Sequence, residues 1–180
     1  MKKIEKETIT DTDYRMPSIS FKPPRAVADG GGGTIICVAD IDATPEQIFR
    51  ALTTDEVEKW WQHPDYYRQK EWKADLRVCG QWSVAVKFAN GIPDNHATGE
   101  FAELDAPHRI VMTRKFEAHP LQEQRETTVT YRLDPTSAGT RLTMREEGYI
   151  GRSATAFGNA EHWERVLGWL DNYFNSLSFS

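Results

Sequence analysis

The stretch that decides the fold is residues 157–177, FGNAEHWERVLGWLDNYFNSL. Its hydrophobic side chains recur every three or four residues, which is the period of an amphipathic α-helix. The stripe comprises Phe157, Ala160, Trp163, Val166, Leu167, Leu170, Phe174 and Leu177. At 1.5 Å per residue, such a helix spans about 35 to 40 Å, which is long enough to cross a β-sheet. We therefore expect one long C-terminal helix whose apolar stripe is covered by another element.

The segments before this helix change to the two-residue period of β-strands. Hydrophobic residues alternate in Trp72–Val78 and in Trp82–Phe88, and Asn90-Gly91 is typical of a chain reversal. Further strands are expected over residues 97–104, 109–116, 127–133 and 140–147. With an earlier strand at residues 35–41, the pattern predicts about seven antiparallel strands.

Two short helices are expected after the strand at residues 35–41. Thr44-Pro45-Glu46-Gln47 fits a helix start, since its threonine can cap, its proline suits the first helical position and its glutamine can complete a capping box. A second cap at Asp55 precedes a helical turn that ends in Trp60-Trp61. The sheet and the C-terminal helix bury their apolar surfaces only against each other. The sequence thus predicts an α+β fold in which a curved antiparallel sheet wraps around one long helix.

The N-terminal segment shows neither period. Pro17, Pro23 and Pro24 interrupt it, and the four glycines of residues 30–33 follow. A glycine run can also hold a phosphate group, but neither Lys-Ser/Thr nor a helix start comes after this one, so a linker is favoured. We therefore predict a flexible tail and glycine linker at residues 1–33 and a single domain at residues 34–180.

Composition restricts the partners and the compartment. The net charge is −5 and the 22 Lys and Arg residues are scattered, so the sequence predicts no nucleic-acid partner, which would need a basic stripe. The longest apolar run, Ile35–Ala39, is far shorter than the roughly 18 residues of a membrane span. Polar residues follow Lys2-Lys3 where a signal peptide would be apolar. We expect a cytoplasmic protein in which Cys37 and Cys79 are buried free thiols.

Several segments carry a family resemblance. They are Asp40–Thr53, Trp60-Trp61, Asp75–Trp82, Gly99–Phe101, Pro107–Val111, Gly139–Thr143 and Gly168-Trp169. In this order, over about residues 34–177, they resemble the START-like or SRPBCC superfamily, and within it the bacterial branch similar to the heat-shock-protein-90 ATPase activator. Cys79 departs from the pattern, because the family usually has the first of two adjacent glycines there. The resemblance implies a helix-grip fold with a cavity between sheet and helix, and members with different ligands and activities.

Candidate cavity residues follow from that arrangement. The resemblance places the pocket mouth near the short helices, the sheet and the entry to the last helix, which favours Trp60, Trp82 and Phe157. Alternation puts further side chains on the inward faces of strands, and methionine suits an adaptable wall. These additional candidates are Met112, Tyr131, Met144 and Glu146.

Groups that could transfer protons from the cavity are the carboxylates of the predicted strands, Glu100, Glu146 and Glu147, and His162 of the last helix. A buried Glu146 would require a partner such as Arg77, Arg114 or Tyr131. His162 lies beside the helix stripe, where it could reach the cavity as a general base, although a histidine at the edge of the core is the simpler interpretation. The sequence offers no nucleophile with its base, no phosphate loop and no histidine pair at i, i+4. We therefore assign no catalytic residue, no metal and no cofactor.

Three functions remain open at this stage. Binding of a small hydrophobic or amphipathic molecule is favoured over an enzyme, because the fold builds a concave, mostly apolar site. A cyclase- or hydratase-type enzyme acting on a polyketide-like ligand would need a cavity acid or base with a shifted pKa. A chaperone-interaction module would need an exposed apolar patch. We expect a monomer or a weak homodimer.

Overall fold

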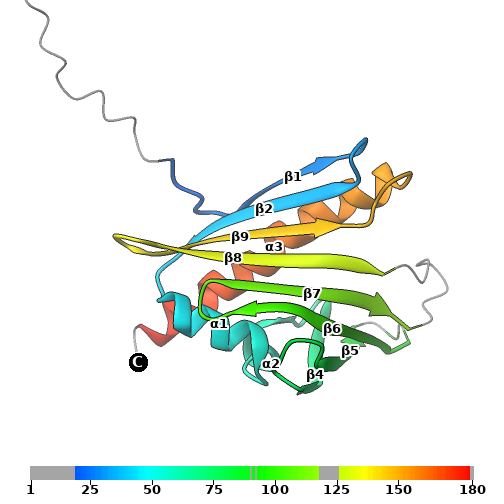
Figure 1. Ribbon diagram of the computed structural model, residues 1–180, viewed down its shortest axis with the longest axis horizontal. Helices are drawn as coiled ribbons and strands as arrows, with labels where there is room; N and C mark the ends of the chain where they lie inside the picture. The colour runs from blue at the N-terminus through cyan, green and yellow to red at the C-terminus, as the bar shows by residue number, and fades with distance from the viewer. Residues whose placement is uncertain (1–18, 90, 92, 118–125, 179–180) are drawn as a thin grey trace, which may run out of the picture.

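The computed structural model describes residues 19–89, 91, 93–117 and 126–178. In these residues one antiparallel sheet has nine strands in the order β1-β2-β9-β8-β7-β6-β5-β4-β3, and helix α3 crosses one of its faces (Figure 1). The strands are β1 Arg25–Asp29, β2 Thr34–Ile41, β3 Gln62–His63, β4 Tyr67–Ala74, β5 Gln81–Phe88, β6 Asn95–Asp105, β7 Arg109–Phe116, β8 Thr127–Thr136 and β9 Gly139–Glu147. The α+β architecture with a curved sheet around a C-terminal helix is confirmed. The described strands outnumber the expected seven because β1 and the two-residue β3 are added.

Helix α3, Ser153–Leu177, buries one stripe against the sheet. Ala160, Trp163 and Leu170 belong to that stripe, as the sequence predicts. Phe157, expected on the same stripe, is 57% exposed, because the neighbouring Ala156 takes the inward position and Phe157 lies beside the loop between β1 and β2. No helix in the described ranges has both the length and the apolarity needed to cross a membrane.

Helices α1, Pro45–Thr53, and α2, Val57–Trp60, follow β2 directly. The predicted capping box is present: the Thr44 hydroxyl accepts a hydrogen bond from the Gln47 amide at 3.3 Å, and the Gln47 side chain accepts one from the Thr44 amide at 2.8 Å. These bonds satisfy two donors that a helix start leaves open. The inward face of α1 buries Ile48 and Leu52, so α1 closes one end of the core.

Residues 25–33, assigned from the sequence to a tail and linker, form strand β1 and its turn into β2 instead. β1 pairs with β2 from Arg25 opposite Val38 to Asp29 opposite Thr34. The glycines shape the turn, because Gly33 has φ +65° and a Cβ there would collide with the backbone of Ile150. β1 is an edge strand, and the Glu164 carboxylate of α3 accepts a hydrogen bond from its Ala26 amide at 2.8 Å. The tail before residue 19 lies outside the described residues.

Strand β4 begins and ends earlier than the sequence predicts. The alternation over Trp72–Val78 indicates a strand there, but the chain turns after Ala74, and Leu76 and Val78 are 45% and 52% exposed. Hydrogen bonds from the Arg77 amide to the Asp75 carbonyl and from the Gly80 amide to the Arg77 carbonyl, both 2.8 Å, close this turn. Cys79 lies in this turn with φ +62° and is exposed, so the expectation that it is buried is wrong. Cys37 is a buried free thiol, as expected.

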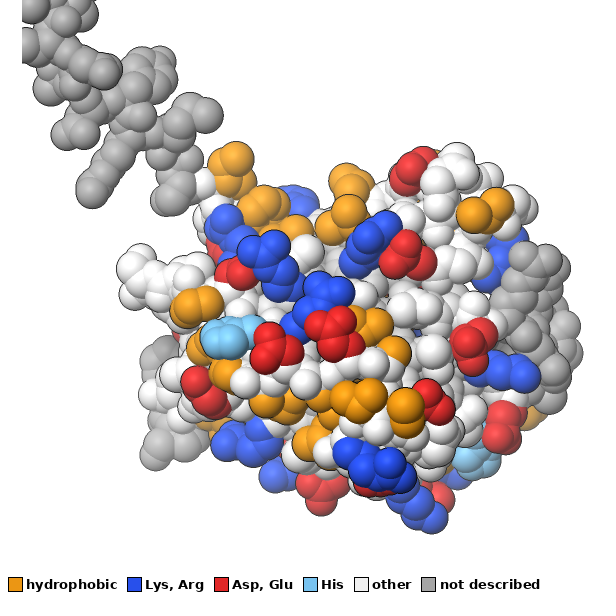
Figure 2. All heavy atoms as spheres, viewed as in Figure 1, with side chains coloured by type: hydrophobic (Ala, Val, Ile, Leu, Met, Phe, Trp, Pro, Cys, Tyr) orange, Lys and Arg blue, Asp and Glu red, His pale blue; other side chains and the backbone are white. Residues whose placement is uncertain are grey.

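The two faces of the sheet have different surroundings. Figure 2 shows side chains of both charge signs spread among hydrophobic ones on the face that Figure 1 presents to the viewer. Helix α3 lies over the opposite face (Figure 1), and its Trp163 belongs to the same buried core cluster as Ile110 and Leu142 of the strands. Helix α3 lies close to β1 and β2, and the pocket is on the side of the helix toward β4 to β8.

Candidate functional site

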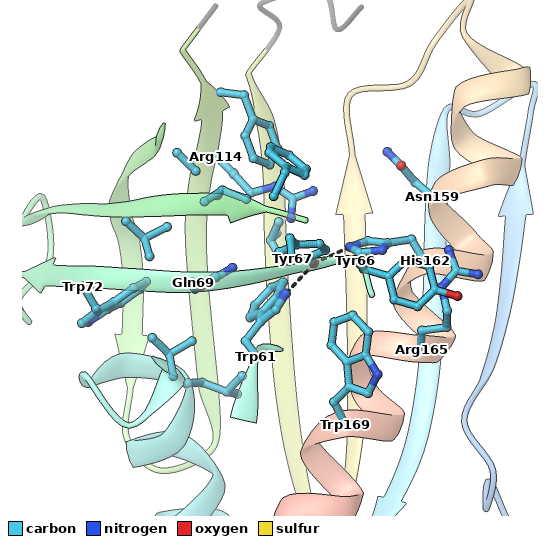
Figure 3. A pocket seen from close by; sticks show the side chains of 18 of the residues that line it. Trp61, Tyr66, Tyr67, Gln69, Trp72, Arg114, Asn159, His162, Arg165 and Trp169 are labelled. Atoms are coloured by element: carbon cyan, nitrogen blue, oxygen red, sulfur yellow. Dashed lines mark hydrogen bonds between the residues drawn. The ribbon is translucent and has the colours of Figure 1, made fainter. Parts of the chain in front are cut away.

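A cavity of about 460 Å³ lies between strands β4 to β8 and residues 158–169 of α3 (Figure 3). The strands supply a mostly apolar wall that includes Val84, Ala97 and Val129. The helix contributes a second stripe, offset from the one that packs on the sheet, whose members are Gly158, Asn159, His162, Arg165 and Trp169. A concave apolar space with a few polar groups is the general form of a small-molecule site.

Three of the seven candidate residues lie on this wall: Trp82, Met112 and Tyr131. Trp82 stacks on Trp72 with ring centroids 5.5 Å apart and planes 16° apart. The indole N–H of Trp82 donates to the Thr113 carbonyl at 3.2 Å, so its apolar face is what the pocket meets. Burial raises the pKa of the Tyr131 hydroxyl, which keeps it protonated at neutral pH.

The structure does not place the other four candidates on the pocket wall. Trp60 packs under α1, where its indole N–H donates to the Ala51 carbonyl at 2.8 Å. Phe157 points to the exterior, and Met144 is fully buried on β9. Glu146 is fully buried behind the wall rather than on it. Alternation indicates which face of a strand each side chain takes, but not how far along the strand the cavity reaches.

Glu146 holds a buried ion pair beside the cavity. Its carboxylate pairs with Arg114, one of the partners that the sequence suggests, and accepts the indole N–H of Trp163 at 2.7 Å. The Arg114 guanidinium lies 5.4 Å from the ring centroid of Phe116 and 5.3 Å from that of Trp163. Although burial opposes its charged form, the charge of Glu146 raises the pKa of Arg114. Arg114 reaches the pocket wall, so this pair connects the core with the site.

A hydrogen-bonded chain of three side chains runs across the pocket. The indole N–H of Trp61 donates to the Tyr67 hydroxyl at 2.6 Å, and this hydroxyl is 2.9 Å from Nε2 of His162 (Figure 3). Because an indole can only donate, the Tyr67 hydroxyl is free to donate its own proton to a neutral His162. This assigns the proton of the imidazole to Nδ1.

The environment keeps both titratable members of this chain neutral. Burial, together with the charges of Arg114 and Arg165, lowers the pKa of His162 from 6.5 to about 4. Burial also raises the pKa of the Tyr67 hydroxyl, although the Trp61 N–H opposes that change. At neutral pH the pocket therefore presents a tyrosine donor and an uncharged imidazole.

Aromatic side chains from separate elements form the mouth of the pocket. Trp169 of α3 lies 5.6 Å from the His63 ring centroid and 5.9 Å from that of Tyr67. Arg165 sits over the ring of Tyr66, with its guanidinium carbon 5.6 Å from the centroid. Figure 3 shows Tyr66, His162, Arg165 and Trp169 grouped on the helix side of the pocket.

Sequence reasoning missed most of this polar set. Tyr67 lies in a stretch to which the pattern assigns no strand, so its contact with α3 had no signal. Arg165 and Trp169 could have been found, because they follow His162 at helical spacings of three and seven residues. Within the described residues, no group of three or more His, Cys, Asp or Glu side chains could hold a metal ion.

Residues 42–175 match a family model described as "Activator of Hsp90 ATPase homolog 1-like protein". The comparison with curated proteins gives no match.

Solved bacterial structures are similar over most of the chain. A Rhodobacter sphaeroides protein is 21% identical with a TM-score of 0.70, covering 84% of this chain and 99% of its own. A Chromobacterium violaceum protein is 24% identical with a TM-score of 0.68, and the match covers 78% of this chain and 96% of that protein. A Mycobacterium smegmatis protein is 18% identical with a TM-score of 0.69, and the match covers 84% of this chain and 94% of that protein. At these identities the likeness shows a shared fold.

Proposed function

Because the chain belongs to the family of Activator of Hsp90 ATPase homolog 1-like proteins and contains an apolar pocket, we propose that it binds a small hydrophobic or amphipathic molecule. The observation that carries this proposal is the cavity of about 460 Å³ beneath α3. Its volume falls within the range of roughly 300 to 1,000 Å³ of small-molecule sites. Trp82, Met112 and Tyr131 are the sequence-predicted residues that would contact the ligand.

Two glycines of α3 allow a matched test. Gly158 lines the pocket, and a Cβ added there meets no atom within 4 Å, so Gly158→Trp places an indole at the pocket without a backbone clash. Gly168 is equally open to a side chain but does not line the pocket, which makes Gly168→Trp the control. Both changes replace a poor helix former, so neither should unfold the helix.

The measurement is a thermal-shift screen of fatty acids, naphthalene derivatives and flavonoid-like compounds, followed by calorimetric titration. A ligand at a hundredfold its dissociation constant stabilises the fold by about 2.7 kcal/mol. Gly158→Trp should lower affinity at least about tenfold, whereas Gly168→Trp should leave it unchanged. If no compound shifts the wild type, or if both variants bind equally well, the proposal is wrong. Chaperone interaction, which the family description names, then becomes the better hypothesis.

The pair of Tyr67 and His162 favours a second candidate, an enzyme that moves protons on a bound polyketide-like ligand. In this hydrogen bond the Tyr67 hydroxyl can pass its proton to Nε2 of the neutral His162 while it takes a proton from the ligand, so the two side chains together act as a base. The test is deuterium exchange at the α-carbon of a bound aryl ketone in heavy water, followed by NMR. Catalysed exchange that is lost in His162→Gln while the ketone still binds supports an enzyme, and exchange at the uncatalysed rate excludes this chemistry for that ketone.

A further inference from the structure

The charged groups of the pocket are unevenly distributed. Among the described residues, two arginines line it, Arg114 from β7 and Arg165 from α3, and Asp65 is the one acidic residue that does so. Asp65 is strongly exposed, with 82% of its side chain accessible, and Arg165 is also exposed, so both charges lie at the mouth of the pocket. The described part of the pocket lining therefore carries more basic than acidic side chains.

Arg114 does not account for this excess, because its charge is already balanced. It pairs with the buried Glu146, which also accepts the Trp163 indole N–H. The aromatic rings of Phe116 and Trp163 flank the guanidinium and fix its position. The Nε–H of Arg114 has no hydrogen-bond partner, but an anion there would share a positive charge that already pairs with Glu146.

Arg165 supplies the charge that remains unbalanced. Among the described residues, no carboxylate forms an ion pair with its guanidinium, although Glu161 and Glu164 are on the same helix. Glu164 points to the other side of α3, where it accepts the Ala26 amide. Arg165 instead lies over Tyr66 at the pocket, next to His162 (Figure 3).

The state of His162 agrees with a positive local potential. Arg114 and Arg165 both oppose its protonation, after burial itself. Its Nε2 is occupied by Tyr67, which leaves Nδ1–H as a donor without an acceptor among the described residues. A guanidinium and an imidazole N–H at one mouth are both donors, and an anionic oxygen accepts from each.

From this arrangement we infer that the ligand is an amphipathic monocarboxylate, bound with its acid group beside Arg165 and His162 and its apolar body against Trp72 and Trp82. The inference rests on the proposed binding function and names its ligand class. One unbalanced arginine fits one negative charge, which favours a carboxylate over a dianionic phosphate. The stacked indoles present a flat apolar surface, which suits a ring compound or an acyl chain.

Three probes of nearly equal shape test this inference: naphthoate, naphthamide and naphthylmethylammonium. Their affinities are measured by calorimetry at low salt for the wild type, for Arg165→Gln and for the control Arg132→Gln. Arg132 is an exposed arginine of β8 that pairs with Asp134 and does not line the pocket. Naphthyl phosphate serves as a fourth probe for a dianionic acid group.

We expect the wild type to bind naphthoate about fivefold tighter than naphthamide, with naphthylmethylammonium the weakest. Arg165→Gln should bring the ratio of naphthoate to naphthamide affinity to about one, whereas Arg132→Gln should keep it. The inference is wrong if the wild type binds naphthoate and naphthamide equally well, or if it prefers naphthyl phosphate or naphthylmethylammonium. It is also wrong if Arg165→Gln keeps the wild-type ratio of naphthoate to naphthamide affinity. In each of these cases the binding function itself stands. Failure of all the probes to bind would instead count against the binding function itself, and the inference would fall with it.

Discussion

The depressed pKa of His162 predicts that the protein loses stability in mild acid. The folded pKa is about 4 against 6.5 for a free histidine, so the unfolded chain binds the proton more readily between these pH values. Stability is therefore complete above about pH 6.5 and falls as the pH approaches 4. At about 1.4 kcal/mol per pKa unit, this difference amounts to about 3 to 4 kcal/mol for the single group, of which about 3 kcal/mol is lost by pH 4.

His162→Gln isolates that contribution. Glutamine keeps an acceptor for the Tyr67 hydroxyl but has no proton to gain, so its free energy of unfolding should lack this part of the pH dependence. Urea unfolding of both proteins at several pH values between about 7.5 and 4 gives the difference between their free energies of unfolding. The contributions of the carboxylates, which both proteins share, cancel in this difference. The difference, wild type minus variant, should fall by about 3 kcal/mol over this range.

A control and a direct measurement complete the test. His96 on β6 is exposed, and His96→Gln should leave the acid-dependent loss as in the wild type. NMR titration of the imidazole carbons reports the protonation of His162 itself. A free-energy difference that stays constant with pH, or an imidazole that titrates near pH 6.5, would show that His162 is not shielded as the structure indicates.

Three further changes have defined outcomes. Leu170→Ala should reduce the free energy of unfolding by about 2 to 5 kcal/mol, because its side chain is fully buried against the sheet; a change under about 0.5 kcal/mol in urea unfolding would place it on the surface. Glu146→Gln should cost about 3 to 5 kcal/mol by leaving Arg114 charged and unpaired, and a smaller cost when Arg114→Met is combined with it would identify the ion pair as the cause. Gly33→Ala should lower the melting temperature, since a Cβ at φ +65° is strained and meets the backbone of the β9–α3 loop; an unchanged melting temperature would contradict that geometry.

Much of the fold could be read from local pattern. The capping box at Thr44 and the helix stripe around Trp163 depend on residues close in sequence, and the family resemblance that they supported is confirmed. The errors arose where a tertiary contact overrides pattern. The register shift between Lys70 and Lys73, together with the turn that closes at Gly80, moves β4 away from the alternation that the sequence shows.

The pocket was less predictable than the fold. Alternation correctly turned Met112 and Tyr131 inward, and it indicated that Glu146 would need a partner such as Arg114. It could not show that Tyr67 meets His162, because these residues lie 95 positions apart and their contact depends on where the sheet bends over α3. Contacts of this kind between distant segments can be identified only from the three-dimensional packing.

The two edges of the sheet have a consequence for self-association. An open edge strand offers unpaired amides and carbonyls as a template for an extended segment of another molecule. At one margin β3 is only two residues long, which gives such a segment few groups to pair with. At the other margin Glu164 already occupies the outward amide of Ala26, so an incoming strand would first have to displace a carboxylate anchored on the long helix. The long helix that lines the pocket thus also removes one backbone donor through which a further strand could pair at this edge.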